Sequence, residues 1–296
     1  MKRLALILLC ACGGSKTVDN TKAAQLFDRV PIQTDNGLSG IAVDDHGVIW
    51  TESERDHSVF AITLDGTRVA STTRYAVVGA PDAVDLEAIA WLGPGKLAFG
   101  TEGQADDRAQ VVTASIDEPT HTIKVDRAID LPRDQLGLEI KPNDGVEGLC
   151  GAGGVVYAAI ESTATDEHGR WAPVVRIELA TGAVQVTHVA LTSDKGKLSS
   201  LDCTIDRDGS ADAILIERHF AITRFTRAHL PSPLPARIDP KVVLDLAPVL
   251  RGALNLEGIG VLRDGRVVAV VDNQYGGIQG PNELLVFRPG TVPSAP

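Results

Sequence analysis

Acidic and hydroxyl side chains recur along the chain, each near the start of a short apolar run. The residues that open these runs are Ser39, Glu87, Glu147, Ser200 and Glu257. An acid closes the apolar run that follows each of them, and these closing acids are Glu52, Glu102, Glu161, Glu217 and Asp272. Carboxylates gathered in one place raise one another's pKa values unless a cation is bound. Oxygen ligands of this kind suit Ca²⁺ or Mg²⁺, so these residue types indicate a divalent-cation site if the fold brings them together.

The spacing of each pair predicts that its two residues face each other across a hairpin. Opposed residues in an antiparallel hairpin have a constant index sum, and half that sum marks the turn. For Glu257 and Asp272 the turn falls at Asp264-Gly265, and the other four pairs also centre on turns that contain Gly or Asp. Opposed side chains project to the same side, with Cβ atoms ~5 Å apart. We therefore expect eight acids and two serines at one end of a channel.

Three interpretations of this acidic end stay open. In the first, the acids bind a divalent cation, with Ca²⁺ favoured, through Glu87, Glu102, Glu147, Glu161, Glu217, Glu257 and Asp272. In the second, the carboxylates accept backbone hydrogen bonds from neighbouring repeats and hold the fold together. In the third, they form a solvated rim.

The elements that position these residues form a repeat. Five segments share one pattern, an opening residue, an apolar strand, a turn, a second apolar strand and an acid, and the openings lie 48, 60, 53 and 57 residues apart. Such periods are typical of propeller blades, and two further strands can be placed in each interval. We predict an all-β fold, a β-propeller of four-stranded blades. Five blades are counted, and the intervals leave room for a sixth without the motif.

The last repeat lacks one strand. After residue 273 we expect only Glu283–Phe287, and the N-terminal residues 24–33 can supply the missing strand. Pairing the first and last segments closes a ring and removes a free sheet edge. The expected organisation is one propeller domain over residues 23–290 and a tail over residues 291–296.

Small residues alternate with large apolar ones in the first strand of most repeats, as in Gly258 and Gly260. Alternate residues share a face, so one face is nearly bare, which suits crowding near a propeller axis. Cys150 and Cys203 occupy one position in successive repeats. A disulfide is one interpretation, but we favour two unpaired cysteines that act as small buried hydrophobes.

The N-terminal residues have the features of an export signal. Lys2-Arg3 precedes a short apolar stretch that ends in Leu9-Cys10-Ala11-Cys12, a pattern similar to a bacterial lipoprotein signal. We expect a signal peptide over residues 1–11, a lipid on Cys12, a tether over residues 12–22, and attachment to the cell envelope at the outer membrane. An ordinary secretory signal is the alternative.

Composition excludes several function classes. The chain has a net charge of −11, which argues against nucleic acid as a partner, and it contains no GxSxG, HExxH or nucleotide-binding glycine motif. Arg218 is a cation beside a closing acid. Its planar guanidinium group either binds a phosphate or carboxylate ligand through two hydrogen bonds or pairs with a neighbouring glutamate.

Five motifs in order resemble the family described as "esterase-like activity of phytase". They are NGLSGIA (36–42), DLEAIA…GTEG (85–103), GVEGLC…AAIE (145–161), LSSLDC…LIERH (198–219) and NLEGIG…VVDN (255–273). The resemblance implies a β-propeller and a phosphoester-hydrolase role.

The function classes that remain are set by the acids. A metal-dependent phosphoester hydrolase would use Glu147 or Glu257 to deprotonate water and Arg218 to hold phosphate. The alternatives are a non-catalytic propeller that binds a ligand or protein, and a lactone hydrolase similar to gluconolactonase-type propellers. A small anionic ligand is the expected partner in the first class.

Overall fold

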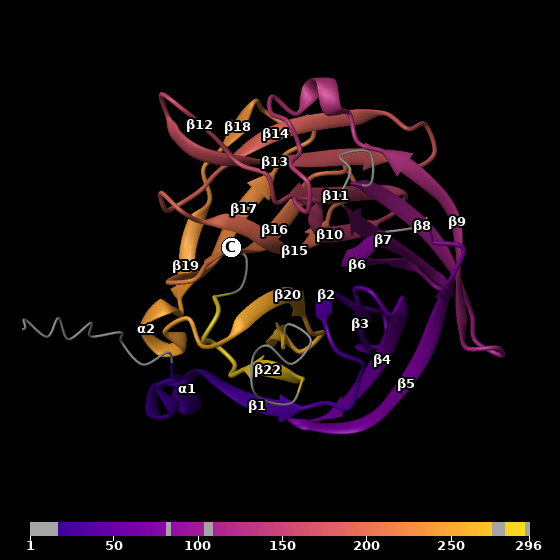
Figure 1. Ribbon diagram of the computed structural model, residues 1–296, viewed down its shortest axis with the longest axis vertical. Coiled ribbons are helices and arrows are strands. Elements are labelled where there is room, and N and C mark those ends of the chain that lie inside the picture. The colour runs from indigo at the N-terminus through magenta and orange to yellow at the C-terminus, as the bar shows by residue number, and fades with distance from the viewer. Residues whose placement is uncertain (1–16, 81–83, 104–108, 274–281, 294–296) are drawn as a thin grey trace, which may run out of the picture.

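The computed structural model describes residues 17–80, 84–103, 109–273 and 282–293 of the chain. The predicted signal peptide and the lipidation site Cys12 lie outside the described residues. Strands dominate the fold and are arranged as a ring of sheets (Figure 1). Among the described helices, none combines the length and apolar character needed to cross a membrane.

The described strands form five four-stranded blades, as predicted. Blade 1 contains β2 (Leu38–Val43), β3 (Ile49–Ser53), β4 (Ser58–Asp65) and β5 (Arg68–Val78). Blade 2 contains β6 (Asp85–Gly93), β7 (Lys96–Glu102), β8 (Gln110–Asp117) and β9 (Thr122–Asp130). Blade 3 contains β10 (Val146–Ala152), β11 (Val155–Ile160), β13 (Gly169–Glu178) and β14 (Val184–Ala190). Blade 4 contains β15 (Lys197–Ile205), β16 (Ala211–His219), β17 (Ile222–Leu230) and β19 (Lys241–Asp245). Blade 5 contains β20 (Asn255–Val261), β21 (Val267–Asp272), β22 (Glu283–Phe287) and β1 (Phe27–Pro31).

Short elements extend this frame. The strands β12 (Ala164–Asp166) and β18 (Arg237–Ile238) add to blade 3, and β5 pairs in parallel with β9 to join blades 1 and 2 at their outer edges. The inner strands β2, β6, β10, β15 and β20 contact one another in ring order around the centre (Figure 1).

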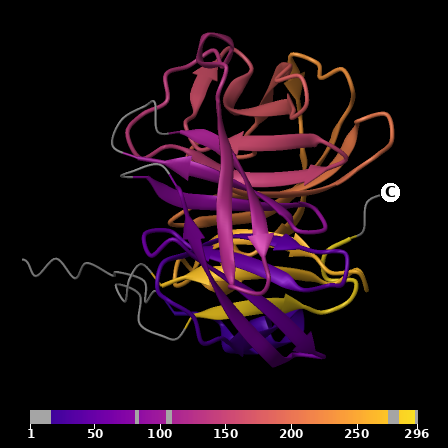
Figure 2. The same ribbon diagram turned by 90° about the vertical axis from the view of Figure 1, so that its right-hand side faces the viewer.

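The N-terminal strand closes the ring, as predicted. β1 pairs antiparallel with β22, from Phe27 opposite Phe287 to Pro31 opposite Glu283. Figure 2 shows this strand beside the yellow strands of blade 5. The strand is shorter than the predicted residues 24–33, because residues 24–26 belong to the helix α1 (Asn20–Leu26).

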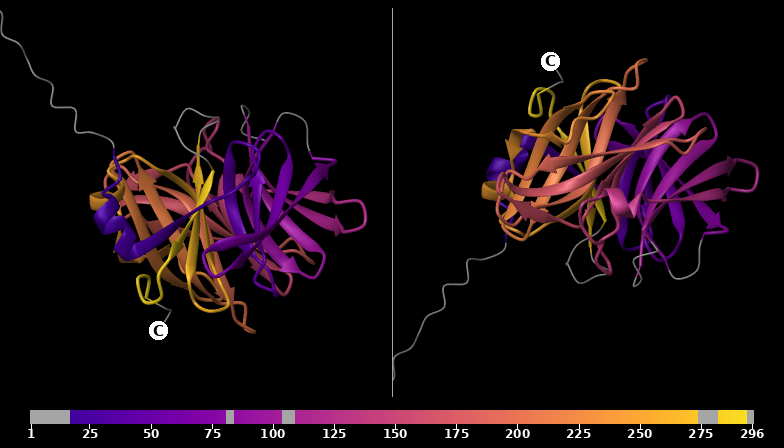
Figure 3. Two further views of the ribbon diagram at one scale, coloured as in Figure 1. Left: turned by 90° about the horizontal axis from the view of Figure 1, so that it is seen from below. Right: turned by 90° about the horizontal axis from the view of Figure 1, so that it is seen from above.

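The helix α1 also takes in residues that the sequence assigned to a tether. Asp19 caps its N-terminus through a bond from the Lys22 amide, and the Asp19 amide donates to the Val249 carbonyl at 2.8 Å. Val249 lies in α2 (Ala247–Leu250), and the two helices pack together on one flank of the ring (Figure 3). Residues 20–22 are therefore part of the folded domain.

The hydrophobic core lies between the blades. Along β21, Val267, Ala269 and Val271 pack into the cluster shared with blade 4, whereas Val268 and Val270 pack into the cluster shared with blade 1. Alternate strand residues point to opposite faces, so a blade buried on both faces needs a continuous apolar run.

Small residues on the inner strands allow neighbouring blades to approach. A Cβ atom on Gly258 would lie 2.6 Å from the carbonyl carbon of Gly40 in the next blade. A Cβ atom on Gly148 would meet the Leu201 amide nitrogen of blade 4. The predicted bare face is thus the face on which one inner strand packs against the next.

Cys150 and Cys203 form a disulfide, with Cα atoms 5.6 Å apart. The prediction of two unpaired cysteines is wrong. Their shared position in successive repeats places them on adjoining inner strands, β10 and β15, where the bare faces bring the backbones close enough to bridge. The disulfide joins blades 3 and 4.

Candidate functional site

Three of the opening glutamates lie in β-bulges. The ladder between β6 and β7 pairs Leu86 with Thr101 and then Ala88 with Gly100, which leaves Glu87 without a partner opposite. Glu147 and Glu257 are bulged in the same way. A bulge bends the strand and changes where a side chain points.

These bulges overturn the predicted cross-strand acid pairs. Glu102 opposes Asp85 instead of Glu87, and Asp272 opposes Asn255 instead of Glu257. The Glu161 amide donates to the Gly145 carbonyl at 3.0 Å, so Glu161 does not oppose Glu147 either. The index-sum argument assumes a regular ladder, and one extra residue in the inner strand breaks it.

Blade 4 departs furthest from the prediction. Its ladder pairs Leu198 with Glu217 and Lys197 with Arg218, so the bulged residue is Ser199 and not Ser200. By register, Arg218 takes the position that an acid holds in the other blades. A one-residue shift in register turns a side chain to the opposite face.

Glu217 is therefore not a member of the acidic group, contrary to its assignment as a metal ligand. Its carboxylate accepts bonds from the Thr192 amide at 2.8 Å, the Thr192 hydroxyl at 2.6 Å and the Ser193 hydroxyl. It holds the loop over residues 192–196 instead.

In blade 1 the closing position belongs to Glu54. Ser39 does oppose Glu52 as predicted, but the Glu54 amide donates to the Gly37 carbonyl, 2.9 Å away, just as Glu161 bonds Gly145. Glu52 lies two residues earlier and is fully buried, with both carboxylate oxygens lacking a hydrogen-bond partner among the described residues. Burial raises the pKa of Glu52 well above its ordinary value, which favours the protonated form of this side chain.

The closing and bulged residues meet in one cavity of about 440 Å³ at one end of the ring. Six acids predicted for the site line it, together with Glu54: Glu87, Glu102, Glu147, Glu161, Glu257 and Asp272. The remaining lining residues are Arg55, Asn143, Lys197, Arg218 and Asn255. The acids come from blades 1, 2, 3 and 5, whereas blade 4 contributes Lys197 and Arg218.

Burial and mutual repulsion raise the pKa values of several of these acids. Burial, reinforced by Glu147, raises the pKa of Glu87 well above its ordinary range. Burial, with repulsion from Glu161, does the same for the pKa of Glu147. Burial also raises the pKa of Glu54 to about 8, with Asp272 and Glu257 adding to the shift.

The basic side chains of blade 4 neutralise part of this charge. Lys197 forms an ion pair with Glu161, but burial still raises the pKa of Glu161 to about 8. Arg218 donates to Glu257 Oε1 at 2.5 Å, and the Asn255 amide donates to the same oxygen at 2.7 Å. Arg218 thus pairs with a glutamate, which is one of the two roles predicted for it from the sequence.

The arrangement fits a divalent cation. One oxygen each of Asp85, Glu87 and Glu102 lies within 4.8 Å of the others, and so does one oxygen each of Glu102, Glu147 and Glu161. The second oxygen of Glu257, Oε2, is enclosed and has no hydrogen-bond partner among the described residues. A set of buried carboxylates with too few donors is stabilised by a hard cation.

The serines of the repeat form hydrogen bonds between blades, a role that the sequence analysis considered only for the carboxylates. Ser39 Oγ donates to the Glu87 carbonyl at 2.7 Å, and Ser199 Oγ donates to the Leu256 carbonyl at 3.1 Å. Ser200 Oγ accepts from the Ile259 amide at 3.0 Å. Each of these bonds joins the inner strands of two neighbouring blades.

Sequence reasoning missed Glu54, Asp85 and Lys197. Glu54 follows Glu52 by two residues, and only the observed register shows which of the two reaches the cavity. Lys197 stands one residue before the LSS motif, at the position that Asp85 and Asn255 occupy in their repeats. Aligning the residue before each motif would have revealed it.

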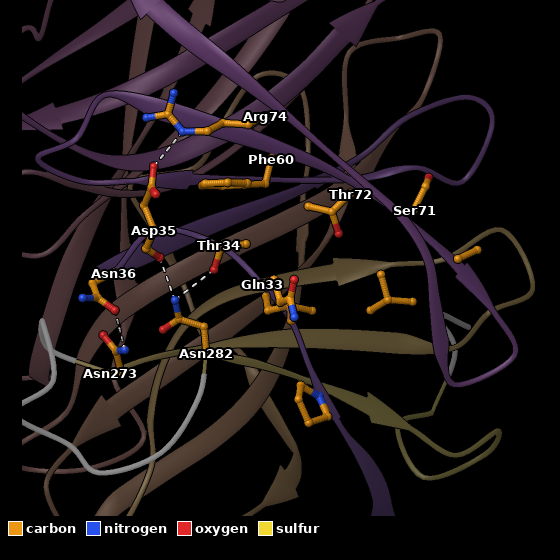
Figure 4. Close-up of a pocket in the computed structure, with 14 residues that line it drawn as sticks. Gln33, Thr34, Asp35, Asn36, Phe60, Ser71, Thr72, Arg74, Asn273 and Asn282 are labelled. Atoms are coloured by element: carbon orange, nitrogen blue, oxygen red, sulfur yellow. Dashed lines mark hydrogen bonds and ion pairs between the residues drawn. The ribbon is translucent and has the colours of Figure 1, made fainter.

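A wider pocket of about 970 Å³ lies between blades 5 and 1 (Figure 4). Its polar groups bind one another: Arg74 donates to Asp35 at 2.8 Å, and Asn282 donates to Thr34 at 2.9 Å. Asn273 donates to Asn36 at 3.0 Å. With these groups already paired, the pocket is a weaker candidate for chemistry than the acidic cavity.

Comparison with known families identifies the family of the chain. The family model described as "Phytase-like: Esterase-like activity of phytase" matches residues 17–275. No curated protein matches the chain.

Solved structures share only a general likeness. A PQQ-bound aldose sugar dehydrogenase from Streptomyces coelicolor is 13% identical, with 88% of this chain and 98% of that chain covered and a TM-score of 0.47. The soluble aldose sugar dehydrogenase of Escherichia coli in its apo-form is 9% identical, with coverage of 89% and 99% and a TM-score of 0.47. A catalytically inactive virginiamycin B lyase from Staphylococcus aureus with quinupristin is 12% identical, with coverage of 88% and 99% and a TM-score of 0.43. Likeness at this level carries no argument about function.

Proposed function

The chain belongs to the phytase-like family, and we propose that it is a phosphoester hydrolase that depends on a divalent cation, with Ca²⁺ as the favoured ion. The observation that carries this proposal is one cavity that is lined by seven carboxyl groups from blades 1, 2, 3 and 5 and, on its blade 4 side, by the basic side chains of Lys197 and Arg218. An acidic cavity repels phosphate unless cations reverse its charge, so metal and substrate belong together here.

Two clusters of three acidic residues could hold the cation, and Glu102 belongs to both. One is Asp85, Glu87 and Glu102, and the other is Glu102, Glu147 and Glu161. When bound, the cation supplies positive charge that attracts the phosphate and polarises its phosphorus–oxygen bonds.

The chain's own residues supply the remaining chemistry. Arg218 and Lys197 donate to phosphate oxygens from the blade 4 side of the cavity. Glu257 accepts the proton of the attacking water through Oε2, the oxygen without a partner among the described residues. Burial raises the pKa of Glu257 even though Arg218 opposes the shift, which makes its carboxylate a stronger base than a surface glutamate. As the phosphorus–oxygen bond breaks, Glu54, whose pKa is about 8, returns a proton to the leaving oxygen.

The test is hydrolysis of a phosphomonoester such as 4-nitrophenyl phosphate, measured with Ca²⁺ and with EDTA. We expect turnover only with the cation, and Glu257→Gln should lower kcat by about 100-fold or more, the usual size of a general-base contribution. The matched control is Glu139→Gln, which removes the same charge at an exposed position outside the cavity. Ca²⁺ binding without turnover of phosphoesters would favour the non-catalytic ligand-binding alternative, and turnover of lactones instead would favour the lactonase alternative.

We also propose that the protein is exported and held at the outer membrane by a lipid on Cys12. The Leu9–Cys12 pattern supports this. Cys12→Ser should release the protein from the membrane fraction or leave its signal peptide uncleaved. Wild-type protein recovered free in the periplasm would contradict the anchor.

A further inference from the structure

A second pocket adjoins the acidic cavity on the side of blade 4. Its volume is about 560 Å³, and its lining residues are Arg170, Asp194, Lys195, Lys197, Arg218, His219 and Phe220. Lys197 and Arg218 line both spaces. The pocket has four Lys or Arg side chains for one carboxylate, in a chain whose net charge is −11.

The pocket is held in shape by Glu217. Its carboxylate binds both the amide and the hydroxyl of Thr192, at the start of the loop that carries Lys195. A Cβ atom on Gly196 would collide with this same carboxylate, so the loop can pack this closely only because residue 196 is glycine. Arg170 Nε donates to the Gly196 carbonyl at 2.9 Å and fixes the opposite wall. The residue predicted as a metal ligand thus builds the neighbouring basic pocket.

Several donors in the pocket are available to a ligand. The Lys195 side chain forms no ion pair or hydrogen bond within the described part of the chain. The His219 ring packs edge-on against the Phe220 ring, with a centroid distance of 5.0 Å. Arg218 Nε is enclosed and lacks an acceptor among the described residues. The Phe220 side chain, 74% exposed, offers an apolar edge beside these donors.

Two ion pairs connect this pocket to the acidic cavity. Lys197 holds Glu161, which is a candidate cation ligand, and Arg218 holds Glu257. A divalent cation that takes the Glu161 carboxylate competes with Lys197 for it. Lys197 is then left to interact with an anion on its other side.

We propose that this basic pocket binds an oxyanion of the phosphate type, and that a divalent cation in the acidic cavity strengthens the binding. The coupling, but not the anion site itself, rests on the proposed function. Because coupling between two binding sites is reciprocal, the oxyanion must strengthen cation binding by the same factor.

The experiment is calorimetric titration of the full chain with phenylphosphonate. This compound has a phosphorus–carbon bond in place of the ester bond, so a phosphoester hydrolase cannot cleave it, and the titration reports binding without turnover. We expect the phenylphosphonate Kd to weaken about 5- to 10-fold in Lys195→Gln and in His219→Gln at pH 6. Lys241→Gln, which removes the same charge from an exposed position on β19 of the same blade, is the matched control and should leave the Kd unchanged. Titration with benzoate distinguishes a phosphate-type site from a general carboxylate site, and equal affinity for benzoate would overturn the assignment to phosphate-type anions.

The same titration with Ca²⁺ and with EDTA tests the coupling. We expect at least fivefold tighter phenylphosphonate binding with Ca²⁺, within the usual range of coupling between sites. Binding unaffected by both pocket variants, or no binding in either buffer, would overturn the anion site. A separate Ca²⁺ titration shows whether the proposed function has failed. If the protein does not bind Ca²⁺, the coupling is overturned. Phenylphosphonate binding that depends on Lys195 would still support the anion site in that case.

Discussion

The acidic side chains around the cavity have higher pKa values in the folded protein than in the unfolded chain. Over a range of pH they are therefore protonated in the folded state and ionised in the unfolded state. Glu54 and Glu161 have ordinary pKa values of 4.5, and burial raises both to about 8. For a carboxyl group with a raised pKa, the folded state binds more protons than the unfolded state between those two values. Stability therefore falls as pH rises through that window, and the loss is complete only above about pH 8.

The raised pKa values predict that the melting temperature depends on both pH and Ca²⁺. In EDTA the melting temperature should fall by several degrees between pH 5 and pH 9, and Ca²⁺ should restore most of it at the higher pH. The reason is that a bound cation replaces the protons that the carboxylates lose. Differential scanning calorimetry across this pH range, with and without Ca²⁺, measures both effects. A melting temperature that changes with neither pH nor Ca²⁺ would mean that the acids are exposed to solvent or already have hydrogen-bond partners.

At the scale of elements, the repeat was predictable but the register was not. The apolar runs, their turns and the 48- to 60-residue period are properties of the sequence, and they led to five blades. Which acids reach the cavity depends on a bulge in each inner strand, and the repeat pattern of the sequence does not mark the position of the bulge. In blade 4 the error was one residue, and it exchanged Glu217 for Arg218. The prediction therefore counted Glu217 among the acids of the site, whereas in the structure Arg218 takes that position and, with Lys197, gives the cavity a basic side.

The contact between inner strands predicts the effect of adding a methyl group to Gly258. A Cβ atom there would lie within 2.8 Å of backbone atoms of Gly40 and Ile41, which cannot move without shifting blade 1. Gly258→Ala should destabilise the protein by ~1–3 kcal/mol, the usual cost of overpacking. Gly265→Asn, in an open turn with φ +81, is the control and should be almost neutral, because asparagine tolerates that conformation. Equal melting temperatures for Gly258→Ala and wild type would contradict the close packing.

The disulfide between β10 and β15 predicts a redox effect on stability. Cys150 and Cys203 are 53 residues apart, so their bond restricts a long segment of the unfolded chain. The double variant Cys150→Ala, Cys203→Ala should lose ~2–4 kcal/mol. Thermal unfolding with and without dithiothreitol measures this, and the reductant should affect wild type but not the double variant. If dithiothreitol leaves the wild-type melting temperature unchanged, the two cysteines do not stabilise the fold by pairing.

At the scale of the whole molecule, a ring of five blades depends on one strand from the other end of the chain. β1 covers the edge of β22, which would otherwise present unpaired backbone groups to solvent. The helices α1 and α2 pack beside this closure, and the cluster between blades 4 and 5 contains residues from both of them. The sheet that carries the cavity acids of blade 5 is therefore completed by a strand near the N-terminus, far away in sequence.

Phe27 offers a direct test of this closure. Its side chain is 2% exposed and packs against Phe287, with ring centroids 5.2 Å apart. Phe27→Ala should cost ~3–5 kcal/mol, the usual range for a buried phenylalanine, and should uncover the edge of β22. The neighbouring Asp28→Ala removes only an exposed ion pair with Arg288 and should cost less than ~1 kcal/mol. Urea unfolding gives both free energies, and hydrogen exchange at the β22 amides reports the edge itself. If β22 amides exchange no faster in Phe27→Ala than in Asp28→Ala, the N-terminal strand does not hold the ring closed. Faster exchange there, together with weaker Ca²⁺ binding, would connect the closure of the ring to the geometry of the cavity.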